Sequence, residues 1–174
     1  IQTGDGTGTI ALQNQLSGLA SASMPTGSVL QVVHGSYGSS VSSASSTYAD
    51  TGLTLNITPS STSSKILVIV SHPEVARIGS GVPSSIKLGI KLMRDSTDLT
   101  VMCNQTMDYV MSYQNSNGAG WLGMAGPSVT YLDSPSSTSA LTYKTQLRNA
   151  TGNTNGVRIM GDAPSKITLM EIAG

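Results

Sequence analysis

The chain has 174 residues, which is enough for one domain with a substantial core and too few for two independent ones. Only 10% of the residues are charged, and nine basic residues balance nine acidic ones, so no excess positive charge attracts nucleic acid or an anionic membrane. The single cysteine, Cys103, cannot form an internal disulfide and is expected to be a small buried side chain in a strand. A chain short of charge and of long helix-forming side chains favours β-structure.

The first 24 residues differ in pattern from the rest of the chain. Their apolar side chains are sparse and irregularly spaced after the turn cluster GDGTG, so this segment cannot form a core alone. We expect residues 1–24 to be a neck or linker that continues an upstream shaft and packs against neighbouring copies, and residues 25–174 to be the folded domain. Because the chain has no basic leader and no long apolar run, neither a signal peptide nor membrane insertion is expected.

From Pro25 onward, short apolar segments alternate with turn residues. The segment GSVLQVVHG alternates weakly between apolar and polar side chains. The segment LTLNIT alternates strictly, with Leu53, Leu55 and Ile57 on one face, which is typical of a half-buried strand. The segment KILVIV, residues 65–70, is apolar on both faces and rich in β-branched residues. It is therefore expected to be a central strand that is covered on both sides.

The middle of the chain predicts two more strand regions and a loop. In SIKLGIKLMRD the apolar residues alternate with Lys87 and Lys91, which are expected to point outward. The region LTVMCNQTMDYVMSYQ is a further strand region rich in methionine and tyrosine. Residues 115–128 contain many glycines and the sole tryptophan, Trp121, and are expected to form a loop.

The last third of the chain repeats the same pattern. The segments SVTYL, ALTYKTQLR, GVRIM and KITLMEIA are separated by the turns DSPSST and NATGNTNG. In ALTYKTQLR, one face carries Leu141, Tyr143, Thr145 and Leu147. Short strands at fairly regular spacing, with Gly, Asn, Ser and Pro between them, predict an all-β fold, namely an antiparallel β-sandwich or jelly roll.

The chain ends on the apolar segment SKITLMEIAG, which is unusual for a terminus. We expect this strand to be pinned inside a sheet, close to an axis shared with other copies. Two-sided strands such as KILVIV carry more apolar surface than one sandwich core needs, so other copies of the chain are expected to cover the excess. Glu171 in the terminal strand is either a solvent-facing partner of Lys166 or Lys65, or a buried charge at a subunit interface. The first reading is favoured because an unpaired buried charge is costly.

No motif in the sequence indicates catalysis or metal binding. The serines do not form G-x-S-x-G, and neither His34 nor His72 has a spacing that indicates a catalytic triad. No His, Cys or Asp cluster has metal-ligand spacing, and GDGTG lacks the strand and helix that frame a nucleotide loop. We therefore predict no catalytic residue, no metal, no cofactor and no enzymatic activity.

Aromatic residues in the Gly-, Ser- and Asn-rich segments are the best candidates for ligand contacts. Exposed aromatic faces beside amides and hydroxyls suit sugar rings, which stack and form hydrogen bonds. The alternative is that these residues anchor loops to the core. The residues in question are Tyr37, Tyr48, Tyr109, Tyr113 and Trp121. Of these, we retain Tyr37, Tyr109, Tyr113 and Trp121 as candidate contacts.

Several segments together resemble a known group of viral domains. They are PTGSVLQVV, TGLTLNITPSSTSSKILVIV, KLMRDST, YLDSPSSTSALTYKTQLR and ITLMEIAG. They resemble a domain of bacteriophage and marine-virus tail-fibre or head-fibre proteins, over most of residues 25–174. The most specific parts are LTLNITPSSTSSKILV and the terminal MEIA. The opening TGDGTGTIAL is similar to the linkers that precede such domains.

The resemblance implies a homotrimeric tip domain, similar in architecture to the jelly rolls of tumour necrosis factor and the complement globular heads. It implies a location in the virion and a role in attachment to a host cell-surface carbohydrate or protein, with the N-terminal segment contacting other virion proteins. The family has no catalytic motif to transfer, and its receptor-contacting loops vary. The alternatives are a capsid-decorating fibre with a mainly structural role, or a secreted cellular jelly-roll binding module.

Overall fold

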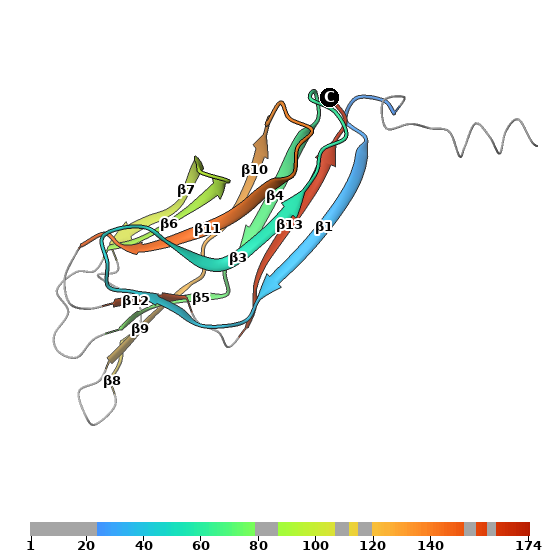
Figure 1. Ribbon diagram of the computed structural model, residues 1–174. Coiled ribbons are helices and arrows are strands. Elements are labelled where there is room, and N and C mark those ends of the chain that lie inside the picture. The colour runs from blue at the N-terminus through green and yellow to red at the C-terminus, as the bar shows by residue number, and fades with distance from the viewer. Residues whose placement is uncertain (1–23, 79–86, 107–111, 115–119, 152–155, 160–162) are drawn as a thin grey trace, which may run out of the picture.

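The computed structural model describes residues 24–78, 87–106, 112–114, 120–151, 156–159 and 163–174 (Figure 1). Within these ranges the chain forms thirteen β-strands and no helix. The strands make three sheets, and every hydrogen-bonded pair of strands is antiparallel.

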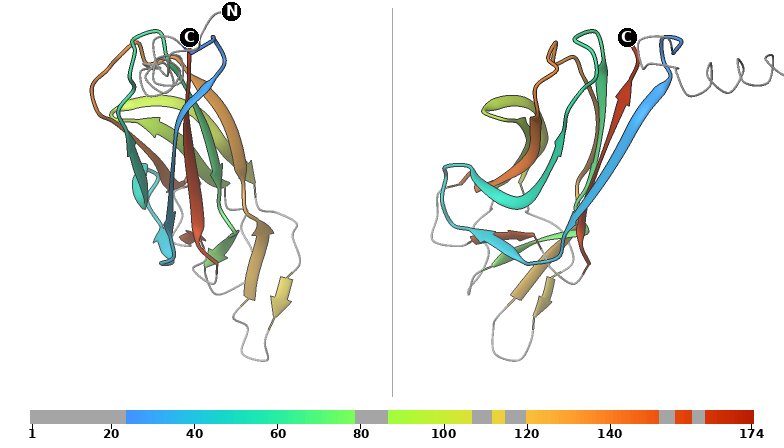
Figure 2. Two further views of the ribbon diagram at one scale, coloured as in Figure 1. Left: turned by 90° about the vertical axis from the view of Figure 1, so that its right-hand side faces the viewer. Right: turned by 45° about the vertical axis from the view of Figure 1, so that its right-hand side comes forward.

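Two four-stranded sheets pack face to face (Figure 2). Sheet I contains, in spatial order, β1 (Val29–Tyr37), β13 (Ser165–Ile172), β4 (Lys65–Ser71) and β10 (Ser128–Asp133). Sheet II contains, in spatial order, β3 (Ala49–Ile57), β11 (Leu141–Asn149), β6 (Lys87–Arg94) and β7 (Thr97–Thr106).

The order in which the chain visits these sheets is that of a jelly roll. Strands β1, β4, β10 and β13 lie in sheet I, whereas β3, the β6–β7 hairpin and β11 lie in sheet II. The chain therefore crosses from one sheet to the other at every step except that hairpin. Eight strands arranged this way in two antiparallel sheets form a jelly-roll sandwich. The predicted all-β antiparallel fold is confirmed.

The connections between sandwich strands build a third sheet. Sheet III contains, in spatial order, β2 (Val41–Ser43), β12 (Gly156–Ile159), β5 (Glu74–Ile78), β9 (Gly120–Ala125) and β8 (Ser112–Gln114). It lies at the lower end of the molecule in Figure 1, whereas the C-terminus and the start of β1 lie together at the opposite end. Backbone hydrogen bonds of 2.8 Å, from Gly27 N to Ala173 O and from Ala173 N to Ser28 O, join those two segments.

The core between sheets I and II is made by the alternating segments of the sequence. Its buried residues are Leu53, Ile57, Ile66, Val68, Val70, Leu92, Leu141, Tyr143, Ile167 and Leu169. Leu55 packs against this cluster, so the predicted inward face of LTLNIT is confirmed. Thr145 and Leu147 are also buried, as the alternation in ALTYKTQLR predicts. A second cluster, which includes Val75, Leu88, Cys103 and Val157, joins sheet II to sheet III.

Two expectations about individual segments need correction. Residues 115–128 are not all loop, because Gly120–Ala125 form β9, which pairs with β5 on one side and β8 on the other. The glycines favour a turn, but β9 lies between β5 and β8, and its backbone hydrogen bonds to these two strands keep it extended. The strand KILVIV is central, as predicted, but the described residues cover only one of its faces: Ile69 on the other face is 37% exposed.

A buried ion pair joins the two sheets of the sandwich. Arg94 of β6 donates from Nη1 to Oδ2 of Asp133 in β10 over 2.5 Å, and the Tyr143 hydroxyl donates to the same oxygen over 2.6 Å. Burial, together with the hydrogen bond to Asp133, raises the pKa of Tyr143 far above its ordinary value, so the phenol keeps its proton. Asp133 therefore links a strand of sheet I to two strands of sheet II.

Candidate functional site

Tyr37, the first of the predicted contact residues, ends β1 on the side nearest to sheet III (Figure 1). It is half-buried and packs against the core. A Cβ atom added at Gly52, which has a φ of 86°, would lie 2.5 Å from Cζ of Tyr37. The ring therefore rests on the backbone of β3 and anchors β1 to it, which is the alternative role that the sequence left open. A contact of Tyr37 with a receptor stays a prediction.

Two of the other predicted aromatics, Tyr113 and Trp121, belong to the end of the molecule formed by sheet III. Tyr113 of β8 and Trp121 of β9 are register partners, directly opposite each other in this antiparallel pair. The pair lies at the end opposite to the start of β1 and the C-terminus (Figure 2). Tyr109 lies outside the described residues. The receptor contacts assigned to these three residues also stay predictions.

The outer face of sheet I carries a continuous row of apolar side chains. The residues that alternate with the buried core positions point away from the core. Backbone register places Val32, Met170, Leu67 and Leu132 directly opposite one another, so that the row crosses β1, β13, β4 and β10. Val32 is 55% and Leu132 51% exposed. We call this row, together with Val29, Ile69 and Ile172 beside it, the apolar face.

The remainder of that surface is uncharged or weakly basic. Threonines and serines occupy the positions toward sheet III, and His34 shares a hydrogen bond of 3.0 Å with Thr168. Lys65 and Lys166 lie at the margins of the apolar face. The four described strands place no carboxylate on this outer face. Contiguous apolar surface without charge is rare on monomeric proteins and typical of protein–protein contacts.

Glu171 does not lie on this face, and the prediction that it points to solvent beside Lys166 or Lys65 is wrong. The residue is buried, and its Oε1 accepts hydrogen bonds from Ser60 N over 2.6 Å and Ser60 Oγ over 2.7 Å. Its Oε2 accepts a bond of 2.6 Å from Gln31 Nε2. Burial alone would raise the pKa of Glu171, but these hydrogen bonds hold it below its ordinary value. Polar donors within the chain thus replace the water around this carboxylate.

His72 lies at the point where the chain passes from sheet I into sheet III, between β4 and β5. The ring is buried, its Nδ1 shares a hydrogen bond of 2.8 Å with Ser165 Oγ, and its Nε2 has no partner in the described part of the chain. A Cβ atom added at Gly126 would lie 1.9 Å from the His72 carbonyl oxygen, so two crossing segments pack closely here. Burial lowers the pKa of His72 to about 4, and the ring is neutral at pH 7.

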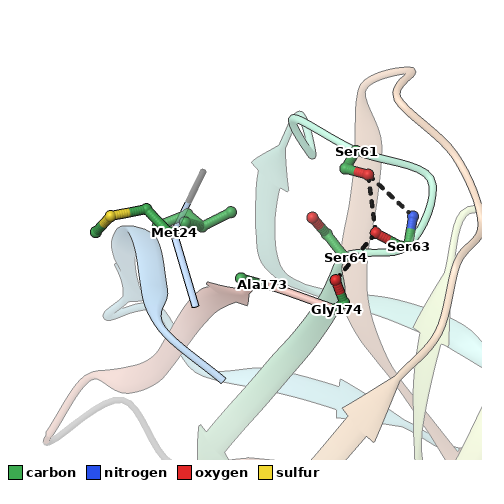
Figure 3. A pocket seen from close by; sticks show the side chains of 7 residues that line it. Met24, Ser61, Ser63, Ser64, Ala173 and Gly174 are labelled. Carbon is green, nitrogen blue, oxygen red and sulfur yellow. Dashed lines mark hydrogen bonds between the residues drawn. The ribbon is translucent and has the colours of Figure 1, made fainter. Parts of the chain in front are cut away.

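A pocket of about 220 Å³ lies between the start of β1, the β3–β4 loop and the C-terminus (Figure 3). Met24 and Leu30 line one side, and Ser61, Ser63 and Ser64 line the other together with the terminal residues. The serine hydroxyls bond mainly to one another and to the chain end: Ser61 Oγ lies 3.0 Å from Ser63 Oγ, which donates to the Gly174 carbonyl over 3.4 Å. The pocket is shallow and has no cluster of ionisable groups.

Tyr48, the aromatic residue that the sequence singled out but did not retain, lies over the outer face of sheet II. Nζ of Lys91 and Cζ of Arg148 each lie 4.5 Å from the centre of its ring. The ring approaches Gly89, where an added Cβ atom would be 3.0 Å from the Tyr48 hydroxyl. No local sequence pattern predicts this cluster, because its members come from three separate segments that the pairing of β11 with β3 and β6 brings together.

No group of three or more His, Cys, Asp or Glu side chains is arranged to hold a metal ion within the described ranges. None of the described segments forms a helix with the length and apolar character needed to cross a membrane.

Neither protein-family models nor curated proteins match this chain. Among solved structures, it is similar to VP2 of infectious bursal disease virus in a subviral particle, with 11% sequence identity and a TM-score of 0.24. The alignment covers 83% of this chain and 37% of the VP2 chain, so this chain spans well under half of the length of VP2. The jelly-roll assignment rests on the strand order of sheets I and II.

Proposed function

We propose that this chain is the tip domain of a viral fibre, a homotrimeric structural protein of the virion that attaches to a carbohydrate or protein on the host cell surface. The single observation that carries the proposal is the apolar face of sheet I. The resemblance of residues 25–174 to viral fibre domains supports the viral origin and the number of subunits.

The apolar face fits contact between copies of the chain better than contact with water. Burying a large apolar side chain fully contributes roughly 1.5–3 kcal/mol, so leaving this row half-exposed forgoes part of that gain at each position. The row runs across all four strands of sheet I, so a neighbouring sheet or edge can cover it without interruption. Without carboxylates to desolvate, burial of this surface has a small electrostatic cost.

The placement of the chain ends supports a fibre-like mounting. Residues 24–28 and the C-terminus lie at one end of the sandwich, and sheet III lies at the other (Figure 1). Rotational symmetry about an axis parallel to the strands keeps every neck on the same side, as a shaft requires, whereas an antiparallel dimer separates them. Sheet III, with Tyr113 and Trp121, then faces away from the shaft, where weak contacts gain avidity from three linked copies.

Light scattering of the purified domain tests the assembly. We expect a mass three times that of the 17.9 kDa chain. Leu132→Lys places a charge at the exposed end of the apolar row and is expected to give a folded monomer. The matched control is Val101→Lys, because Val101 is 57% exposed on β7 of sheet II and its replacement leaves the apolar face intact. A monomeric wild type, or a trimeric Leu132→Lys variant, contradicts the proposal.

Binding of the labelled domain to a panel of bacterial and marine microbial cells tests the attachment. Trp121→Ala and Tyr113→Ala are expected to weaken binding, and Val101→Ala on β7 of sheet II is the control. If the trimer forms but the wild type binds no cell or glycan, the proposed attachment is wrong. A capsid-decorating fibre with a mainly structural role then accounts for the result.

A further inference from the structure

The outer face of sheet II has a basic cluster that the apolar face lacks. Two of its lysines are neutralised: Lys91 pairs with Asp98 over 2.7 Å, and Lys144 pairs with Asp50 over 2.9 Å. Arg148 is different, because no carboxylate among the described residues lies within ion-pair distance of it. Its Nε is buried and has no hydrogen-bond partner in the described part of the chain. The cation is held by stacking against Tyr48 rather than by an anion.

The surroundings of Arg148 form a small, ordered surface. Register places Gly89 opposite Arg148 on one side and opposite Asn104 on the other. A Cβ atom added at Gly89 would lie 2.9 Å from Cγ of Arg148, so the absence of a side chain there leaves room for the arginine. Lys87 lies two residues before Gly89 on the same strand, and it also forms no ion pair with a described residue.

The segment that carries Tyr48 is fixed before any ligand arrives. Asn149 N donates to Ser45 O over 2.8 Å, which ties the loop to β11. Within the loop, Ser45 N donates to Ser43 Oγ over 3.2 Å, and Thr47 N donates to Ser45 Oγ over 3.0 Å. A preformed surface loses less conformational entropy when it binds a ligand.

We propose that the surface around Arg148, Lys87 and Asn104 binds the carboxylate of an acidic saccharide. The inference rests on the proposed attachment function and names the class of ligand. A guanidinium donates two parallel hydrogen bonds to a carboxylate, which a lysine cannot do with the same geometry. The neighbouring amide and hydroxyl groups of Asn104, Ser45 and Thr47 suit the hydroxyls of a sugar ring.

A nucleic acid fits this surface less well than an acidic sugar. Binding to a phosphate backbone depends on many simultaneous lysine and arginine contacts. The cluster offers only two cations without a carboxylate partner among the described residues, and the whole chain has a formal net charge of zero. One carboxylate per sugar unit, repeated along a polysaccharide, matches one such cluster on each subunit of a trimer.

The test measures binding of the purified trimer to polysialic acid and hyaluronan oligosaccharides, with neutral dextran and duplex DNA for comparison. We expect the acidic glycans to bind, dextran not to bind, and Arg148→Gln to weaken glycan binding by about tenfold or more, the effect of losing a charge-assisted pair. Arg148→Lys, which keeps the charge but loses the planar donor geometry, is expected to retain part of the affinity. Thermal melting verifies that each variant is folded.

Lys144→Gln is the matched control, because it removes one positive charge from the same face and the same strand. If it weakens binding as much as Arg148→Gln does, the contact is a general charge effect and the inference is wrong. It is equally wrong if DNA binds more tightly than the glycans. If a wild-type trimer binds host cells but no acidic glycan, this inference fails while the proposed attachment stands. If the wild type is monomeric and binds no cell, the proposed function itself fails.

Discussion

The outer faces of sheets I and II are both built from four antiparallel strands, yet their side chains differ in kind. On sheet I, the central row is Val32, Met170, Leu67 and Leu132. On sheet II, the corresponding central positions carry Asp50, Gln146 and Lys91, with Lys144 and Arg148 beside them. Alternation within a strand fixes only which residues face the core. The polarity of the residues that point away from the core then indicates whether the outer face of the sheet contacts protein or water.

The two faces also differ in how they hold charge. Sheet II pairs Lys91 and Lys144 with aspartates, and these pairs are partly exposed, with side-chain exposures of 66% for Asp98 and 53% for Asp50. Such pairs contribute little to stability but keep the surface hydrated. Sheet I places its two lysines at the margins and its centre is uncharged. A surface that avoids charge at its centre and keeps it at the rim has the composition of a protein–protein interface.

The largest expected effect comes from removing Asp133, which links sheet I to sheet II. Asp133→Ala leaves Arg94 and the Tyr143 hydroxyl without their shared acceptor, and removal of one partner of a buried ion pair costs about 3–5 kcal/mol of unfolding free energy. Urea unfolding measures the loss. Tyr143→Phe, which removes only one donor, is expected to cost about 1–2 kcal/mol. An Asp133→Ala variant as stable as the wild type would show that other contacts hold the sheets together.

The next effect comes from His72, which is buried where the chain passes from sheet I into sheet III. Because the folded-state pKa of His72 is lowered from 6.5 to about 4, folding favours the neutral ring. Stability is then constant above pH 6.5, falls as the pH decreases from 6.5 to 4, and has lost about 3 kcal/mol below pH 4. Denaturant unfolding as a function of pH measures this slope.

His72→Gln is the control for that slope, because glutamine has no proton to gain in this range. The variant is expected to lose the dependence between pH 6.5 and 4. It should keep the decline in stability at lower pH that arises from Glu171. Because the pKa of Glu171 is lowered in the folded state, its carboxylate stabilises the fold above the ordinary pKa of glutamate, and this stabilisation is lost as the pH falls. An unchanged slope in His72→Gln would assign the acid sensitivity to other groups.

The next smaller effect comes from salt, which is expected to act differently on the outer faces of the two sheets. Raising the salt concentration from about 0.1 M to about 1 M shortens the Debye length from about 10 Å to about 3 Å. Assembly through the apolar face is expected to persist, since burial of apolar surface is not screened, and light scattering measures it. Acidic-glycan binding at Arg148 is expected to weaken several-fold in the same titration. Dissociation of the trimer by salt would mean that charge, not apolar burial, holds the copies together.

The smallest expected effect comes from the exposed ion pairs of sheet II. Lys144→Gln is expected to change the unfolding free energy by less than about 1 kcal/mol, because Lys144 and Asp50 are both in contact with solvent. Chemical denaturation measures the difference. A loss of unfolding free energy comparable to that of Asp133→Ala would mean that the exposed ion pairs of sheet II contribute to stability as much as the interior does.

Much of the sandwich is predictable from sequence because alternation is local. Leu53, Leu55 and Ile57 face the core as their spacing predicts, and Leu141, Tyr143, Thr145 and Leu147 do the same. The terminal strand lies between β1 and β4, as its apolar content indicated. Strand β9 was missed because its glycines have low intrinsic strand preference, and only its pairing with β5 and β8 makes it a strand.

Features that depend on register could not be read from the sequence. Glu171 is buried because Gln31 lies opposite it on β1 and the Ser60 loop folds over it, contacts that join residues more than a hundred positions apart along the chain. Arg148 and Tyr48 meet because their neighbours Leu147 and Ala49 are paired between β11 and β3. No local sequence pattern encodes either contact, so the candidate ligand surface around Arg148 could be identified only from the folded structure.

The joined ends of the sandwich also determine how the molecule would respond to a pull. Under the proposed function, a virion held at a cell applies force between residue 24 and the far end at sheet III, in the direction along which β1 runs (Figure 1). The ladder between β1 and β13, paired from Val29–Ile172 to Tyr37–Ser165, is then stretched in shear, so that its hydrogen bonds must yield together instead of opening one at a time. Under the proposed function, this geometry keeps the domain folded while it holds the particle at the cell.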